Sequence, residues 1–172
     1  GKEYVEFLDK GLDTVEFKKK LRGEGRMPHG KAGRMMLDIE IDLLRDFVFK
    51  ISRYKSGYQN EKKNVEIVID TGKLKFRLHG NLNSIYPGQQ LLYRASKRIK
   101  SSDKIRSWIY HLAMNSGNIE KPTIYASTEK DMVFYPVKKN ESLEILKKLS
   151  EIYFKGLNSI PAFTPAIPVS YT

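Results

Sequence analysis

The 172-residue sequence contains no cysteine, which excludes disulfide bonds and thiolate metal sites and suits a reducing compartment such as the cytoplasm. It also lacks any apolar run near the roughly 20 residues that a membrane-spanning helix needs. No signal peptide with a basic start and an apolar centre opens the chain. These absences predict a soluble, cytoplasmic protein.

Acidic residues are scarce relative to basic ones, since 20 Asp and Glu face 31 Lys and Arg and give a formal net charge of +11. Such an excess is typical of proteins whose partner is a polyanion, either nucleic acid or a membrane surface. A merely basic, solvated surface is the alternative. With 40% hydrophobic and 11% aromatic residues, the chain has enough apolar material for one folded domain.

The two ends of the chain predict that it is a piece of a larger protein, because it begins with Gly1 and finishes in a Pro-rich segment. We expect a single domain with a helical and loop lead-in at 1–31, a core at 32–156 and an apolar tail at 157–172. We expect the apolar tail to pack back onto the domain, and the alternative is that it covers the surface of a partner.

Apolar residues at helical spacing predict helices before and after the middle of the chain. Residues 2–21 indicate one or two short helices, and a loop at 22–33 leads into a long amphipathic helix at 32–54. The predicted apolar stripe of that helix comprises Met35, Met36, Ile39, Leu43, Phe47 and Ile51.

Two further helices are expected nearer the end of the chain. Asp103 is suited to open one of them, which stops at 115–117. The other covers 143–154 and is predicted to end at Gly156, because glycine favours helix C-termini.

Alternating apolar and polar residues predict strands in the middle of the chain. Segments 65–70, 74–85 and 89–95 are separated by short turns and indicate a three-stranded antiparallel meander. Two short strands are expected at 122–126 and 132–135. The resulting order favours an α/β fold, with a mixed sheet flanked by helices.

Four glycines in the first loop, Gly23, Gly25, Gly30 and Gly33, raise the question of a phosphate-binding loop. No strand clearly precedes them and no Gly-Lys-Ser/Thr follows, so neither a P-loop nor a dinucleotide fingerprint is present. A tight entry to the long helix is the preferred explanation.

Matching runs spread in order over roughly residues 14–168 resemble one family, and three motifs within them are the clearest. Gly25–Gly33 (Gly-Arg-Met-Pro-His-Gly-Lys-Ala-Gly) is similar to the family pattern Gly-x-Leu-Pro-x-Gly-x-x-Gly. Arg106–Leu112 looks like its Leu-Trp-Leu-x-His-Leu helix, and Tyr153–Leu157 matches its Tyr-x-x-Gly-Met/Leu stretch. Together they resemble the C-terminal nuclease-like domain of RecC, the gamma chain of the RecBCD helicase-nuclease, exodeoxyribonuclease V.

The resemblance implies a restriction-endonuclease-like core of the PD-(D/E)xK type in a domain without a catalytic role. It further implies a place in a large subunit that shapes DNA channels and packs on RecB- and RecD-like helicase partners during double-strand-break repair by homologous recombination. A free-standing nucleic-acid-binding module is one alternative, against which the fragment-like ends argue.

The metal-binding positions of such a nuclease are degenerate in this sequence. The first carboxylate should follow a Gly-x-Leu step on the second strand, where Asn83 stands, and acid-x-Lys should end the third strand, where Tyr93 and Ala95 stand. Mg²⁺ prefers several oxygen ligands with negative charge. We therefore expect neither catalytic residues nor a bound metal or other cofactor.

A shifted register keeps an active Mg²⁺-dependent DNase open as a second alternative. It would combine Asp70 or Glu66 with Lys73 or Lys75. These acids flank a hairpin turn, where carboxylates are usually solvated.

The three histidines, His29, His79 and His111, show no metal-ligand spacing, and His111 is expected to form hydrogen bonds inside the domain.

A basic cluster is the strongest positive sign of a ligand. Between the third strand and the next helix it comprises Arg94, Lys97, Arg98, Lys100, Lys104 and Arg106. These cations are expected to bind DNA phosphates without reading sequence, and a solvated loop or an acidic partner protein are the alternatives.

Overall fold

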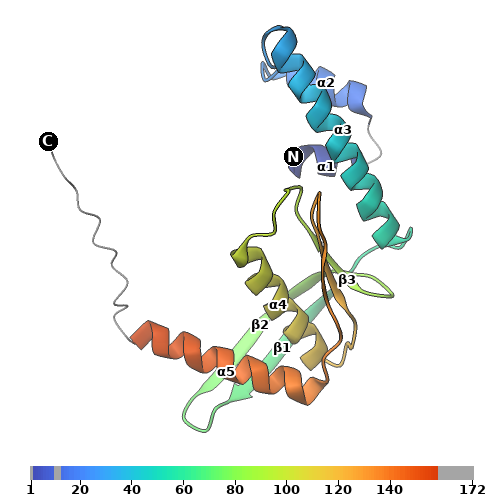
Figure 1. Cartoon of the computed structure of the whole chain (residues 1–172). Coiled ribbons are helices and arrows are strands. Elements are labelled where there is room, and N and C mark those ends of the chain that lie inside the picture. The colour runs from blue at the N-terminus through green and yellow to red at the C-terminus, as the bar shows by residue number, and fades with distance from the viewer. Residues whose placement is uncertain (1, 10–12, 159–172) are drawn as a thin grey trace, which may run out of the picture.

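A computed structural model describes residues 2–9 and 13–158 of the chain (Figure 1). The predicted tail beyond Asn158 lies outside the described residues. The helices are α1 (Lys2–Asp9), α2 (Thr14–Gly23), α3 (Gly30–Lys55), α4 (Ser101–Ser116) and α5 (Lys139–Asn158). The strands are β1 (Glu61–Asp70), β2 (Lys75–Ile85), β3 (Gln90–Tyr93), β4 (Thr123–Ala126) and β5 (Met132–Phe134).

The strands form one mixed sheet in the order β1-β2-β3-β4-β5. Neighbours are antiparallel except for β3 and β4, which are parallel. A parallel pair needs a crossover connection, and α4 lies within the crossover from β3 to β4. The predicted α/β class, the meander of the first three strands and the mixed sheet flanked by helices are confirmed.

The hairpin of β1 and β2 is closed by the turn that the sequence indicated. Gly72 adopts φ 81°, a left-handed conformation that favours glycine, and its N–H donates to the Asp70 carboxylate at 2.8 Å. Both the hydroxyl and the N–H of Thr71 donate to the carbonyl of Leu74 at 3.0 Å. The turn therefore fixes the register in which Ile67 lies opposite Leu78.

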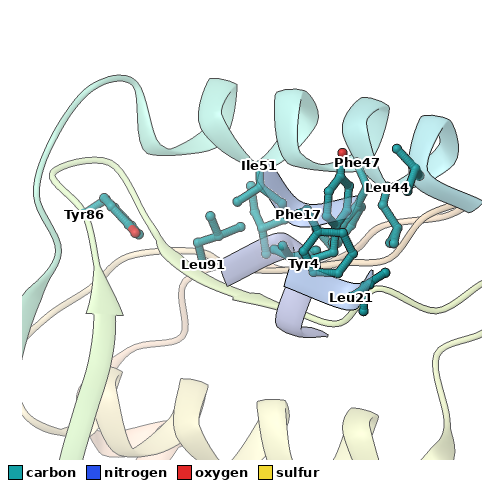
Figure 2. Close-up of a cluster of buried hydrophobic side chains, with 12 residues drawn as sticks. Tyr4, Phe17, Leu21, Leu44, Phe47, Ile51, Tyr86 and Leu91 are labelled. Atoms are coloured by element: carbon teal, nitrogen blue, oxygen red, sulfur yellow. The ribbon is translucent and has the colours of Figure 1, made fainter. Parts of the chain in front are cut away.

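Two hydrophobic clusters cover opposite faces of the sheet. One joins α1, α2 and α3 to β3 and β4, and Figure 2 shows Phe47 and Ile51 of α3 within it, with Leu91 of β3 nearby. The other joins α4 and α5 to β1 and β2 through Ile67 and Leu112, among others. The helices thus form one layer on each side of the sheet (Figure 1).

The apolar stripe predicted for α3 is wrong for four of its six residues. Met35, Met36, Ile39 and Leu43 are exposed, whereas the buried face comprises Ile41, Leu44, Phe47 and Ile51. Side chains four residues apart are displaced by about 40° around a helix of 3.6 residues per turn. A line of i+4 steps therefore winds from the solvent side of α3 to its buried side.

A polar clamp holds α3 against the β4–β5 turn. The Asp131 carboxylate accepts from the Lys50 ammonium and from the Tyr54 hydroxyl, each at 2.6 Å. The Lys50 ammonium also donates to the carbonyl of Ser127 at 2.9 Å. The hydrogen bond to Asp131, followed by burial, raises the pKa of Tyr54 to about 12, so this hydroxyl remains a donor at neutral pH.

Three predicted helix boundaries are wrong, and one of them is the start of α5, which lies at Lys139 instead of residue 143. α4 begins at Ser101, so Asp103 lies in its first turn, where its carboxylate accepts from the N–H of Lys100 at 3.3 Å. α5 continues through Gly156 to Asn158, because open space surrounds the glycine and the Asn158 side chain satisfies the carbonyl of Phe154 at 2.8 Å.

The Gly-rich entry to α3 has a packing reason. A methyl group at Gly33 would lie 2.9 Å from Cβ of Pro28, so a larger residue would push the loop away from the helix. Gly30, the first residue of α3, adopts φ 72°. This close approach agrees with the tight helix entry expected from the sequence.

Two phenylalanines of α3, one buried and one exposed, allow the buried and exposed faces of the helix to be tested by measurements of stability. Phe47 is 3% exposed and Phe49 is 67% exposed. We expect Phe47→Ala to lower the free energy of unfolding by about 3–5 kcal/mol, because it removes a buried ring and leaves a cavity. Phe49→Ala should change it by less than about 0.5 kcal/mol. Urea unfolding measures both, and equal losses would contradict the observed orientation of α3.

Candidate nucleic-acid interface

The strands β2 and β3 diverge soon after their turn. Within the described residues, their ladder contains one residue pair, Ile85 with Gln90. Ser84 adopts a left-handed backbone with φ 62°, and β3 continues beside β4 instead. A pocket of about 790 Å³ lies at this fork. Its walls come from α1, β2, β3, α4 and β4.

The three positions at which the sequence analysis expected metal ligands do not all line the pocket. Tyr93 and Ala95 line the pocket, but Asn83 is not among its lining residues and Ser84 is. Successive residues of a strand point to opposite faces, so a difference of one position exchanges the side chain at the site. Neither Asn83 nor Ser84 carries a negative charge that would attract a divalent cation.

The ring of Tyr93 belongs to the hydrophobic cluster beneath α3. It packs edge-on against Phe47 with centroids 6.2 Å apart, and the Lys55 ammonium lies 5.9 Å from its centroid. Tyr93 therefore helps to hold α3 to the sheet.

Asp103 is the one carboxylate among the described residues that line the pocket. It is buried, and its Oδ2 lies 3.3 Å from Nη1 of Arg94 and accepts from the N–H of Lys100. A buried carboxylate is costly unless it is paired and hydrogen-bonded, and both conditions are met. The negative charge is therefore compensated by the protein itself.

Tyr125 on β4 completes this group. Burial first, and then the negative charge of Asp103 and a hydrogen bond to it, raise the pKa of the Tyr125 hydroxyl to about 12. The hydroxyl therefore stays protonated at neutral pH and donates to the carboxylate. Arg94, Asp103 and Tyr125 join the end of β3, the first turn of α4 and β4.

One face of α4 is directed at the pocket, and the sequence analysis did not identify it as a unit. Asp103, Arg106, Ser107 and Tyr110 line the pocket at positions i, i+3, i+4 and i+7. That spacing places side chains on one side of a helix and was visible in the sequence. It was concealed because Tyr110 falls outside the basic cluster and within an apolar helix.

The six residues of the predicted basic cluster are all exposed, but the structure separates them into two groups. Arg94 and Arg106 line the pocket. The other four lie outside it, on the loop before α4 and on its first turn: Lys97, Arg98, Lys100 and Lys104. We call these four residues the rim cations. The N–H of Thr128, which donates to the carbonyl of Ser96 at 3.1 Å, ties the loop to the segment after β4.

The acids of the shifted register lie elsewhere. Glu66 and Asp70 are exposed on the hairpin of β1 and β2, and neither lines the pocket. Glu66 lies 3.5 Å from Arg77, and Asp70 lies 3.6 Å from Lys75 while it caps the turn. The hydrogen bond from the N–H of Gly72 is the main reason that the pKa of Asp70 is lowered. Both carboxylates thus serve the hairpin.

His111 is buried in a polar network between α4 and the sheet. Its Nε2 lies 2.9 Å from the carbonyl of Tyr135, which can only accept, so Nε2 carries the proton. Its Nδ1 faces Oγ1 of Thr123 at 2.9 Å, and Oγ1 of Thr123 lies 3.1 Å from Oε1 of Gln90. Burial lowers the pKa of His111, against a smaller opposite effect of the bond to Tyr135. The histidine has the internal role that the sequence analysis expected.

His29 and His79 are exposed and distant in sequence from this network. Within residues 2–9 and 13–158, no group of three or more His, Cys, Asp or Glu side chains is arranged to hold a metal ion. None of the helices in these ranges is long and apolar enough to cross a membrane.

Comparison with known proteins gives one family. A family model described as the RecC C-terminal domain matches residues 1–172. No curated protein matches the sequence. A solved structure described as "Crystal structure of SSO0001" aligns with 75% of this chain over 70% of the chain in that structure, with 13% sequence identity and a TM-score of 0.43. A TM-score this low does not define a shared fold.

The neutral state of His111 predicts a specific dependence of stability on pH. Because its pKa is lower in the folded than in the unfolded chain, its contribution is complete above about pH 6.5, the unfolded value, and is lost as the pH falls toward the folded value. Compared with a His111→Gln variant, the natural chain should lose up to about 1.4 kcal/mol of unfolding free energy per pH unit below 6.5. Urea unfolding at pH 7.5 and 5.5 measures this difference.

His79→Gln serves as the control, because His79 is exposed and its replacement should leave the pH dependence as it is in the natural chain. Parallel pH dependences for the natural chain and His111→Gln would show that burial of this imidazole does not shift its pKa.

Proposed function

The chain belongs to the RecC C-terminal domain family, and on that basis we propose that it is a non-catalytic domain that supports subunit assembly and lines the path of DNA. RecC is a subunit of the RecBCD complex, exodeoxyribonuclease V, which works in DNA repair and recombination. The domain would act there, in the cytoplasm, during repair of double-strand breaks. Its partners would be RecB- and RecD-like helicase subunits and DNA.

The proposal includes a restriction-endonuclease-like core of the PD-(D/E)xK type. The order of elements supports this, because three antiparallel strands are followed by α4 and a parallel strand. The pocket lies at the ends of the second and third strands, where the sequence analysis expected the metal site. The core would comprise residues 32–156, with 1–31 as a lead-in whose Tyr4 and Phe17 pack beneath α3, and 157–172 as a tail.

The observation that carries the non-catalytic function is the state of Asp103. Two-metal or one-metal hydrolysis of a phosphodiester needs carboxylates that converge on a hard cation. The described pocket wall offers one carboxylate, and that carboxylate is paired with Arg94. A cation entering beside Asp103 would have to displace the guanidinium and would find no second acid.

The rim cations support contact with the DNA backbone. Lys97, Arg98, Lys100 and Lys104 lie together on the surface around the N-terminus of α4, where the helix dipole adds a partial positive charge. Their exposure leaves them able to neutralise phosphates while counterions are released. Contacts of this kind hold DNA without reading its sequence.

The outer side of α3 supports the assembly role. Five large apolar side chains on α3 each expose more than half of their surface: Met35, Met36, Ile39, Leu43 and Phe49. We call them the outer stripe. Contiguous exposed apolar surface usually marks a protein interface. In Figure 1, α3 extends beyond the sheet, which makes this side accessible to a partner subunit.

DNA binding should depend on the rim cations in a way that salt reveals. Changing Lys97, Arg98, Lys100 and Lys104 to Ala is expected to weaken binding to duplex DNA and to reduce the slope of log K against log salt by about 3.6, since each of four phosphate contacts contributes about 0.9. Changing four other exposed cations, Lys19, Arg22, Lys73 and Lys148, removes the same charge and should leave the slope nearly unchanged. Fluorescence anisotropy over a salt series measures both.

The same DNA tests the active alternative. With Mg²⁺ or Mn²⁺ present, linear DNA is expected to remain intact. Cleavage that disappears on changing Asp70 or Glu66 to Ala would contradict the non-catalytic function and establish the DNase. Equal salt slopes for the rim and control variants would remove the rim cations from the DNA interface.

The assembly role is tested in the full-length parent protein. Ile39→Ser with Leu43→Ser should weaken co-purification with a RecB- or RecD-like helicase subunit by at least about tenfold, because burial of these side chains would be lost from an interface. The unfolding midpoint should not fall, since both side chains are exposed. Val68→Ser with Val133→Ser, exposed apolar residues of β1 and β5, is the matched control. Undiminished binding of the α3 variant would exclude the outer stripe as an interface.

A further inference from the structure

The pocket at the fork of β2 and β3 combines two guanidinium groups with an exposed aromatic ring. Arg94 and Arg106 line it together with Tyr110, and Asp103 is the carboxylate between them in sequence. Two positive charges against one negative charge leave an excess of one positive charge. Its volume, about 790 Å³, lies within the roughly 300–1,000 Å³ of sites that hold small molecules.

The ion pair with Asp103 holds the Arg94 side chain in place but does not use all of its hydrogen-bond donors. Asp103 binds Nη1 of Arg94 and is itself held by the Lys100 N–H and the Tyr125 hydroxyl. The Arg94 side chain nevertheless remains 47% exposed. A guanidinium has five N–H donors in a planar fork, so one contact to Asp103 leaves donors that suit a phosphate.

Arg106 and Tyr110 are one turn apart on the same face of α4. Within the part of the chain that the structure describes, Arg106 has no ion pair, and the Tyr110 side chain is 40% exposed. An aromatic ring four residues from an arginine presents a flat apolar surface beside a positive charge. This pair fits a base and its phosphate better than it fits a simple anion.

The rest of the wall is apolar, aromatic or small. Val5, Leu91, Leu92 and Ala95 line the pocket together with Tyr93 and Tyr125. Ser84 adds a short hydroxyl side chain, whereas the Ser107 hydroxyl is buried and donates to the carbonyl of Asp103. A planar base needs an apolar surface on one side and room on the other, and the methyl group of Ala95 leaves more room than a longer side chain would. A base paired within a duplex cannot enter such a pocket without leaving its stack.

We propose that this pocket binds one nucleotide of single-stranded DNA, with Arg94 and Arg106 on a phosphate and the ring of Tyr110 against the base. The proposal rests on the DNA contact proposed above and assigns it a second, distinct part. The rim cations attract the backbone, and the pocket captures an unpaired base. Asp103 and Tyr125 act as positioning residues, because they orient Arg94 without touching the nucleotide.

The test uses two single-stranded oligomers with the same number of phosphates, dT10 and a 10-mer in which every base is replaced by an abasic residue. Stacking of a base on an aromatic side chain is worth about 1–3 kcal/mol, so the natural chain should bind dT10 at least about fivefold more tightly than the abasic oligomer. Tyr110→Ala should bring this ratio close to one. Fluorescence anisotropy at fixed salt measures the four dissociation constants.

Two comparisons make the result specific. Tyr135→Ala, which removes another exposed tyrosine after β5, should retain the ratio of the natural chain. The four-residue rim variant should bind both oligomers more weakly while retaining the ratio. Arg106→Lys keeps the charge but loses the planar fork, and it should weaken dT10 binding more than the control Arg22→Lys does.

The outcomes separate this proposal from the function on which it rests. A ratio near one in the natural chain, or a ratio unaffected by Tyr110→Ala, would overturn the nucleotide pocket even if the rim variant still weakened binding. Failure of the natural chain to bind either oligomer or duplex DNA would overturn the DNA contact and the pocket together. Capture of an acidic peptide with no preference for dT10 would identify the pocket as a protein-binding site and would likewise overturn it.

Discussion

The buried carboxylate of Asp103 is the constraint on which the fork region depends. Charge in a protein interior must be paired and hydrogen-bonded, and this one is compensated from three separate elements. Arg94 comes from the end of β3, the Lys100 N–H from the start of α4, and the Tyr125 hydroxyl from β4. The carboxylate thereby sets the distance between the parallel strands and the helix that connects them. It also fixes where the loop of rim cations begins and ends.

A second buried polar network supports the first from within the domain. Gln90 and Thr123 lie opposite each other on β3 and β4, His111 reaches Thr123 from α4, and Asn115 lies beside His111 on the same helix. The carboxamide of Asn115 also accepts from the N–H of Val137 at 3.3 Å. Because hydrogen bonds are directional, this network permits one rotation of α4 about its axis. That rotation directs Arg106 and Tyr110 toward the pocket.

The sequence was sufficient for the order of elements because each strand and helix repeats its apolar residues with its own period. The hairpin was predictable from Ile67, Ile69 and the Thr71–Gly72 turn, since alternation and turn chemistry agree there. The faces of α3 were not. Its apolar residues occur on more than one side, so periodicity alone could not separate the core face containing Ile41 and Leu44 from the exposed Ile39 and Leu43.

The candidate site was predictable only in part, because some of its features depend on backbone conformation and on the pairing of strands that are distant in the sequence. The absence of acids at the expected positions and the basic cluster both follow from residue types alone. The choice between Asn83 and Ser84 depends on a left-handed backbone at Ser84, which no local pattern of the chain requires. The grouping of Arg94, Asp103 and Tyr125 depends on the parallel pairing of β3 with β4, which joins residues more than 20 positions apart.

The two arginines that line the pocket would act on a bound phosphate differently from a metal ion. A divalent cation neutralises the phosphate and also lowers the pKa of a bound water, which creates the nucleophile. A guanidinium supplies charge and bidentate hydrogen bonds, but it stays protonated and generates no hydroxide. Since Asp103 is already paired with Arg94, it is poorly suited to act as a base. A strand in the proposed pocket would therefore be bound by charge and hydrogen bonds and released uncut.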